Sequence, residues 1–112
     1  MKDNLKDVNY SYEHGDKTLP KLIDLVSETP DPHKEIILSY LETNCILASP
    51  GIITDEITPN ETIGCGNIYS DGFYMWDDAL IGYVRKYNIT LPKDFREYIL
   101  KNHSNRAKRH LL

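Results

Sequence analysis

Cysteine is scarce in this sequence, long hydrophobic runs are absent, and the middle of the chain lacks lysine and arginine. The two cysteines, Cys45 and Cys65, form no CxxC pair and have no histidine cluster beside them. Structural zinc normally takes four ligands at short paired spacings, so a site combining these thiols with His14 or His33 fits poorly. We therefore expect two free, mostly buried thiols, no metal and no other cofactor.

No apolar run approaches the roughly 18 residues that a membrane-spanning helix needs. The first residues, which are mostly polar, contain no apolar signal region. We therefore expect a cytoplasmic protein. The length of 112 residues fits one domain, residues 1–112, and a content of 40% hydrophobic and 27% charged residues is typical of a globular chain.

Charge is distributed unevenly along the chain. No lysine or arginine lies between Lys34 and Arg85, although that interval holds eight acidic residues, whereas the part from Arg85 onward holds eight basic and two acidic residues. Such a distribution indicates which partners a surface attracts rather than which fold forms. The acidic middle disfavours contact with a phosphate backbone and favours a basic partner.

Apolar spacing and end signals predict four helices. Residues 18–28 place a proline in the first turn of an apolar face, and residues 31–44 begin with an aspartate N-cap followed by proline. The short connection between them predicts an antiparallel N-terminal helical pair. A third helix begins at Asp77 or Asp78, and a fourth covers residues 90–102.

Between the helical regions, short β-branched segments predict a small antiparallel sheet. Asp71-Gly72 between two apolar runs is a strong signal for a two-residue type I′ hairpin turn, which would place Ser70 opposite Phe73. The same arrangement puts three aromatic residues on one face of the hairpin: Tyr69, Tyr74 and Trp76. The other face is also apolar and would need a further element or a partner to cover it.

The predicted fold class is therefore α+β, with an N-terminal helical pair, a small antiparallel sheet and two C-terminal helices. Residues 1–16 lack a period and are expected to form a loosely packed arm. Residues 105–112 are expected to form a basic tail, whose arginines and lysine suit a helix C-terminus.

No residues form a recognisable catalytic motif. Asp77 and Asp78 are adjacent on a helix and so do not converge on one substrate atom, and they fit a helix cap better. Gly64 and Gly66 flank Cys65 but lack the strand and helix of a phosphate-binding loop. We therefore do not expect an enzyme.

One stretch, "SDGFYMWDDALIGYVRKYNITLPKDFREYI" (residues 70–99), resembles small immunity proteins of bacterial polymorphic-toxin and contact-dependent growth-inhibition systems. The similar segment upstream, residues 37–57, is a helix leading into short strands. The matching positions of the pattern are Asp71, Gly72, Phe73 or Tyr74, Trp76, Tyr83, Val84, Tyr87, Leu91, Pro92 and Phe95.

The resemblance implies a protein that binds and neutralises the C-terminal toxin domain of a cognate toxin, often a nuclease with a basic cleft. An acidic and aromatic face could fill such a cleft and block it without chemistry. The residues expected to contact the toxin are Asp55, Glu56, Glu61, Tyr69, Asp71, Tyr74, Asp77 and Asp78. Two alternatives remain at this point: a regulatory or adaptor module that binds a basic cellular protein, and a small nucleic-acid binder that uses the tail.

Overall fold

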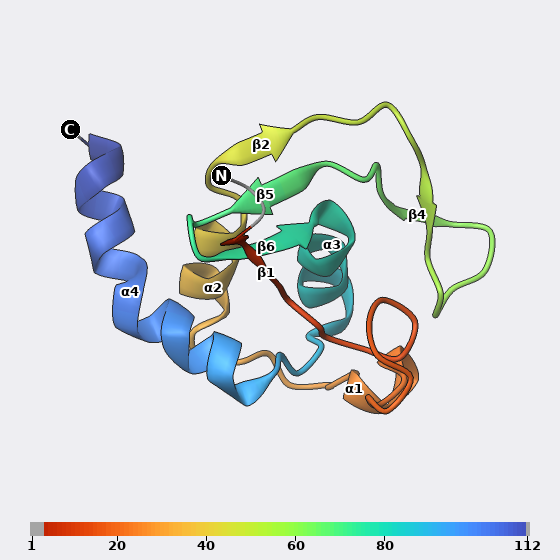
Figure 1. Cartoon of the computed structure of the whole chain (residues 1–112). Coiled ribbons are helices and arrows are strands. Elements are labelled where there is room, and N and C mark those ends of the chain that lie inside the picture. The colour runs from red at the N-terminus through yellow and green to blue at the C-terminus, as the bar shows by residue number, and fades with distance from the viewer. Residues whose placement is uncertain (1–3, 112) are drawn as a thin grey trace.

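The computed structural model describes residues 4–111, with side chains described up to residue 104 (Figure 1). Across these residues the fold is α+β, as the sequence predicts. A four-stranded mixed sheet has the order β1-β6-β5-β2, and a separate pair of strands lies apart from it. The strands are β1 (Lys6–Asp7), β2 (Cys45–Leu47), β3 (Ile53–Thr54), β4 (Thr62–Gly64), β5 (Ile68–Ser70) and β6 (Tyr74–Asp77). The helices are α1 (Leu22–Leu25), α2 (Lys34–Leu41), α3 (Asp78–Tyr87) and α4 (Lys93–Leu111).

The core lies between one face of the four-stranded sheet and helices α2, α3 and α4. Trp76 of β6 is one of its largest buried side chains, with its ring 6.2 Å from that of Tyr40 and 5.5 Å from that of Phe95. The indole N–H of Trp76 donates to the carbonyl oxygen of Leu41 at 2.9 Å, so this buried polar group is satisfied. Because side chains alternate along a strand, Met75 and Asp77 point to the opposite face.

Helix α3 follows the sequence prediction closely. The Asp77 carboxylate caps it by accepting from the amide of Leu80 at 3.2 Å, and Asn88 ends it in the left-handed conformation with φ of 54°. Leu80, Tyr83 and Val84 on the predicted stripe are buried. These signals all lie within one short stretch of sequence, which explains why the sequence alone predicted this helix.

The predicted N-terminal helical pair is wrong. Helix α1 has only four residues, and α2 packs against α3 and α4 rather than against α1. A proline disfavours helical dihedrals in the residue before it, so the segment before Pro20 stays out of the helix. After α1 the chain runs along the α3–α4 connection, where the amide of Thr90 donates to the Leu25 carbonyl oxygen at 2.9 Å.

The N-terminal segment is not a loose arm, at least from residue 4 onward; residues 1–3 of the predicted arm lie outside the described part. Strand β1 pairs in parallel with β6, through amides of Lys6 and Val8 that donate to β6-side carbonyls at 2.8 and 2.9 Å. Val8 and Tyr10 are buried. The segment was missed because its pairing partner is distant in sequence.

The hairpin forms around Asp71-Gly72, but with a wider turn than the predicted type I′ turn. Ser70 pairs with Met75, not with Phe73, and of the two central residues only Gly72 has a positive φ. The Asp71 carboxylate accepts the amides of Phe73 at 2.9 Å and Tyr74 at 2.7 Å, which closes the longer loop. This register differs from the predicted one by two residues, so the predicted faces of the hairpin are preserved.

Two other expectations are corrected by the structure: the burial of the cysteines and the separate basic tail. Both cysteines are exposed, not buried; Cys45 lies on β2, which forms an edge of the sheet. The backbone of α4 continues as a helix through Leu111, where a separate basic tail was expected. The side chains of that predicted tail lie outside the described part, as does residue 112 altogether.

Candidate protein-binding face

The predicted contact residues do not gather into one surface. Asp71 and Asp77 cap the hairpin turn and helix α3, as described above. Asp78 accepts the amides of Cys65 at 3.0 Å and Gly66 at 2.9 Å, which ties the chain after β4 to the start of α3. All three carboxylates are half-buried. These carboxylates mainly accept hydrogen bonds from backbone amides that would otherwise lack partners.

Asp55 is part of the interior rather than of a contact surface, since only 2% of it is exposed. Its carboxylate accepts the amides of Ile57 at 2.8 Å and Thr58 at 3.0 Å, the Tyr87 hydroxyl at 2.6 Å and the Lys86 ammonium at 3.0 Å. Burial raises the pKa of this carboxyl, but the hydrogen bonds outweigh it and lower the pKa to about 2. Asp55 therefore stays ionised and fixes the β3–β4 loop to α3.

Glu56 and Glu61 are exposed. Glu61 forms an ion pair with Lys86, next to Asp55, so part of its charge is neutralised within the molecule. The carboxylate of Glu56 has no hydrogen bond or ion pair with the described residues. Among the six predicted acidic contacts, Glu56 is the one that the fold leaves fully available to a partner.

The two predicted aromatic anchors face the core. Tyr74 is 7% exposed, and its ring lies 4.8 Å from Phe95 and 5.2 Å from Tyr98. Tyr69 pairs with Trp76 across the hairpin and is half-buried, and burial raises its pKa. The aromatic side chain that is exposed is Phe73, at 49%, at the tip of the hairpin. Tyr69 and Tyr74, which the sequence assigned to an interface, therefore pack on the helix-facing side of the sheet.

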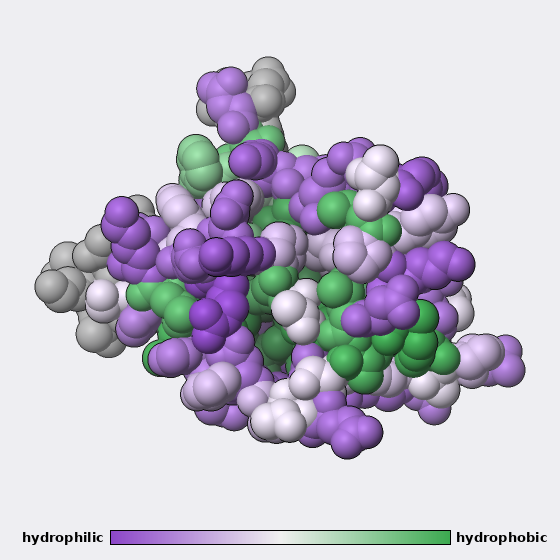
Figure 2. Space-filling model, turned by 90° about the horizontal axis from the view of Figure 1, so that it is seen from below, coloured by the Kyte–Doolittle hydropathy of each residue, from purple (hydrophilic) through white to green (hydrophobic). Residues whose placement is uncertain are grey.

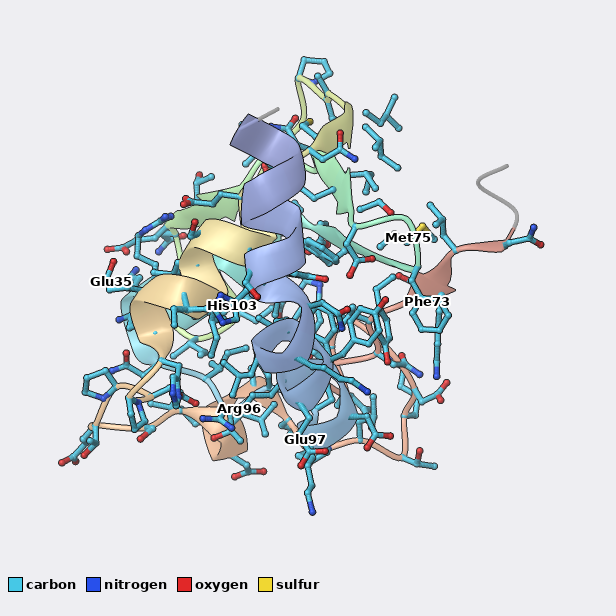
Figure 3. The ribbon with its side chains drawn as sticks, turned by 90° about the vertical axis from the view of Figure 1, so that its left-hand side faces the viewer. Glu35, Phe73, Met75, Arg96, Glu97 and His103 are labelled. Atoms are coloured by element: carbon cyan, nitrogen blue, oxygen red, sulfur yellow. The ribbon has the colours of Figure 1, made fainter. Side chains whose placement is uncertain are left out.

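The opposite face of the sheet is only partly covered and was missed as a site. Asp7, Ile68, Met75 and Asp77 lie on this face, and residues from Val8 to His14 border it. In Figure 3, Phe73 and Met75 lie together beside β1, on the side of the molecule opposite Glu35 of α2. We call this surface, defined by Asp7, Ile68, Met75 and Asp77, the open sheet face.

The open sheet face contains a pocket of about 160 Å³. Tyr10 and His14 form one wall, with their rings stacked at 5.2 Å, and the Tyr10 hydroxyl donates to Asp77 at 3.3 Å. Burial, followed by repulsion from Asp77, raises the pKa of Asp7. Burial also raises the pKa of the Tyr10 hydroxyl. The Nε2 atom of His14 is buried and has no hydrogen-bond partner in the described part of the chain.

Exposed apolar residues elsewhere are dispersed. They lie on α1, on β2 and in the following loop, and include Ile23, Leu47 and Ile52. Figure 2, a view from below Figure 1, shows green hydrophobic patches separated by hydrophilic residues rather than one continuous apolar surface. Isolated exposed apolar residues are normal on proteins and do not by themselves mark a site.

Within the described residues, no three histidine, cysteine, aspartate or glutamate residues gather as metal ligands would, and no helix is both long and apolar enough to cross a membrane. Comparisons with protein-family models, curated proteins and solved structures found no match for this chain. The geometry of the open sheet face is therefore the main basis for a functional proposal.

Proposed function

We propose that this protein is an immunity protein that binds a cognate toxin domain, a nuclease with a basic cleft, and neutralises it by covering that domain. The observation that carries the proposal is the open sheet face, where two carboxylates, Asp7 and Asp77, lie beside apolar side chains. Among the described residues that line its pocket there is no lysine or arginine. A basic surface would be attracted to such a face and would lose water against it.

The wider charge pattern supports the same proposal. The interval without lysine or arginine supplies β2 to β6 and most of α3, so the hairpin that builds the open sheet face contains no basic residue. Phe73 at the hairpin tip is an exposed aromatic side chain near this face, although its ring stacks at 5.3 Å on Tyr98 of α4, and aromatic residues are enriched where interfaces are fully buried. The resemblance of residues 70–99 to immunity proteins is the reason for proposing a toxin domain as the partner.

The proposal is tested by co-expressing the protein with each neighbouring open reading frame of its own bacterium. We expect one basic domain that stops growth when expressed alone, that is tolerated when this protein is present, and that co-purifies with it. A variant with Asp7→Lys should lose this protection, while Glu35→Lys, the same charge change on the far side of α2, should keep it. Recovery of only a housekeeping protein would favour an adaptor and would overturn the immunity proposal.

A further inference from the structure

The pocket in the open sheet face has the construction of a side-chain receptor. Its volume of about 160 Å³ is several times the roughly 30 Å³ that one water occupies in the liquid. Ile68 and Met75 supply apolar lining, and Asp7 and Asp77 supply two carboxylates. Long basic side chains bind in this manner, with the aliphatic stem on apolar surface and the charged head against polar groups.

No lysine or arginine of the described residues forms an ion pair with the carboxylates of the pocket. Lys6 precedes Asp7 in β1, but its ammonium lies 5.7 Å from the Tyr74 ring on the opposite face of the sheet. The Asp77 carboxylate accepts only neutral donors, the Tyr10 hydroxyl and the Leu80 amide. Two carboxylates in one partly buried pocket repel each other, and a bound cation would relieve that repulsion.

The shape of the charged group distinguishes lysine from arginine as the ligand. An ammonium group offers three donors from a single point, whereas a guanidinium presents five N–H donors in a planar fork. The carboxylates of Asp7 and Asp77 come from two separate strands, β1 and β6, and therefore fit the wider fork better.

We propose that this pocket binds one arginine side chain of the partner protein. This inference rests on the proposed function for the nature of the partner. The guanidinium lies between the carboxylates of Asp7 and Asp77, and the methylenes of the arginine pack on Ile68 and Met75. Arginine residues in such desolvated positions are common anchors of protein interfaces.

The test uses N-acetyl-arginine amide as a probe, titrated into the whole protein while amide chemical shifts are followed by NMR. The neutral isostere N-acetyl-citrulline amide is the matched ligand control. We expect saturable shifts, confined to residues around the pocket, with the arginine probe in the millimolar range and none with the citrulline probe. The variant Asp7→Asn should weaken the binding by at least about fivefold, whereas Glu35→Gln should leave it unchanged.

Equal shifts with both probes, shifts spread over the surface, or unchanged binding by Asp7→Asn would each overturn the inference. So would the absence of saturable shifts at millimolar probe concentrations. Thermal unfolding of each variant separates a lost site from a lost fold. If the toxin domain is bound while the arginine probe is not, this inference fails alone; if the probe is bound and no toxin domain is, the proposed function fails alone.

Discussion

At the scale of single residues, the aspartates of this protein act mainly as acceptors for backbone amides. Asp55, Asp71, Asp77 and Asp78 each accept at least one amide from a loop or a helix start. A sequence shows the charge of such residues but not which amides lie near them. For this reason the sequence predicted that Asp77 or Asp78 starts a helix but assigned the same residues to a contact surface.

Asp55 should make stability depend on pH at the acidic end. Its pKa is lowered from 3.8 to about 2 in the folded protein, so its contribution is present above 3.8 and is lost as pH falls through about 2. The shift corresponds to about 2 kcal/mol of unfolding free energy. Urea unfolding of the wild type and Asp55→Asn should therefore differ by about this amount at neutral pH, with the difference shrinking at acidic pH. A difference that does not change with pH would contradict this account.

Gly82 on α3 is required for close packing against β4. A β-carbon at this position would lie 2.4 Å from the carbonyl oxygen of Ile63 and 2.8 Å from its Cγ1 atom. Alanine normally favours a helix over glycine by about 1 kcal/mol, but here we expect Gly82→Ala to lower the unfolding free energy by about 1–3 kcal/mol because of overpacking. Chemical denaturation measures the change, with Ser39→Ala on the exposed side of α2 as a control that should be neutral or slightly stabilising.

Asp7 should be unfavourable to the stability of the isolated protein. Although Asp7 is an exposed residue, partial burial of its carboxyl group and then repulsion from Asp77 raise its pKa, which means that folding disfavours its ionised form. At neutral pH the ionised carboxylate therefore destabilises the fold, so Asp7→Asn should raise the melting temperature slightly while it weakens binding. Differential scanning calorimetry provides the measurement; a lower melting temperature would show that Asp7 has a structural role instead.

At the scale of elements, local signals sufficed for α3 and for the existence of α4 but not for its length, and long-range contacts decided β1 and α1. Helix α3 has its cap, its apolar period and its end residue within one short stretch. Strand β1 has two residues and is held only by β6, which lies far along the chain. Helix α1 is short because backbone groups at its end form hydrogen bonds with other segments, as the Leu25 carbonyl oxygen does with the amide of Thr90. The open sheet face was therefore beyond prediction, since β1 supplies Asp7 to it.

Strand β1 should contribute measurably to stability. Removing residues 1–8 would expose β6 and eliminate the burial of Val8, which is worth about 1.5–3 kcal/mol for a fully buried aliphatic side chain. We expect the unfolding free energy to fall by about 3 kcal/mol once the two lost β1–β6 hydrogen bonds are included. Removing only residues 1–4 is the control, because it leaves β1 in place. Equal stability of the two truncated proteins would restore the view of a loose arm.

At the scale of the whole molecule, some acidic residues form ion pairs within the fold, and others remain unpaired on the surface. Glu42 and Glu61 form ion pairs with Arg85 and Lys86 of α3, so the basic residues that end the acidic interval neutralise part of it. The charge pattern in the sequence therefore overstated the acidic surface. Among the carboxylates that have no ion pair within the described residues, Glu56 lies in the β3–β4 loop, whereas Asp7 and Asp77 border a pocket in the open sheet face.

The most direct measurement is the affinity of the basic domain recovered by co-expression, determined by calorimetry for the wild type, Asp7→Lys and Glu35→Lys. Both variants change the net charge by the same amount, and both replaced residues are exposed. The account predicts that Asp7→Lys weakens binding at least about tenfold, or 1.4 kcal/mol, while Glu35→Lys stays within about twofold of the wild type. Equal affinities for all three proteins would contradict the open sheet face as the binding site.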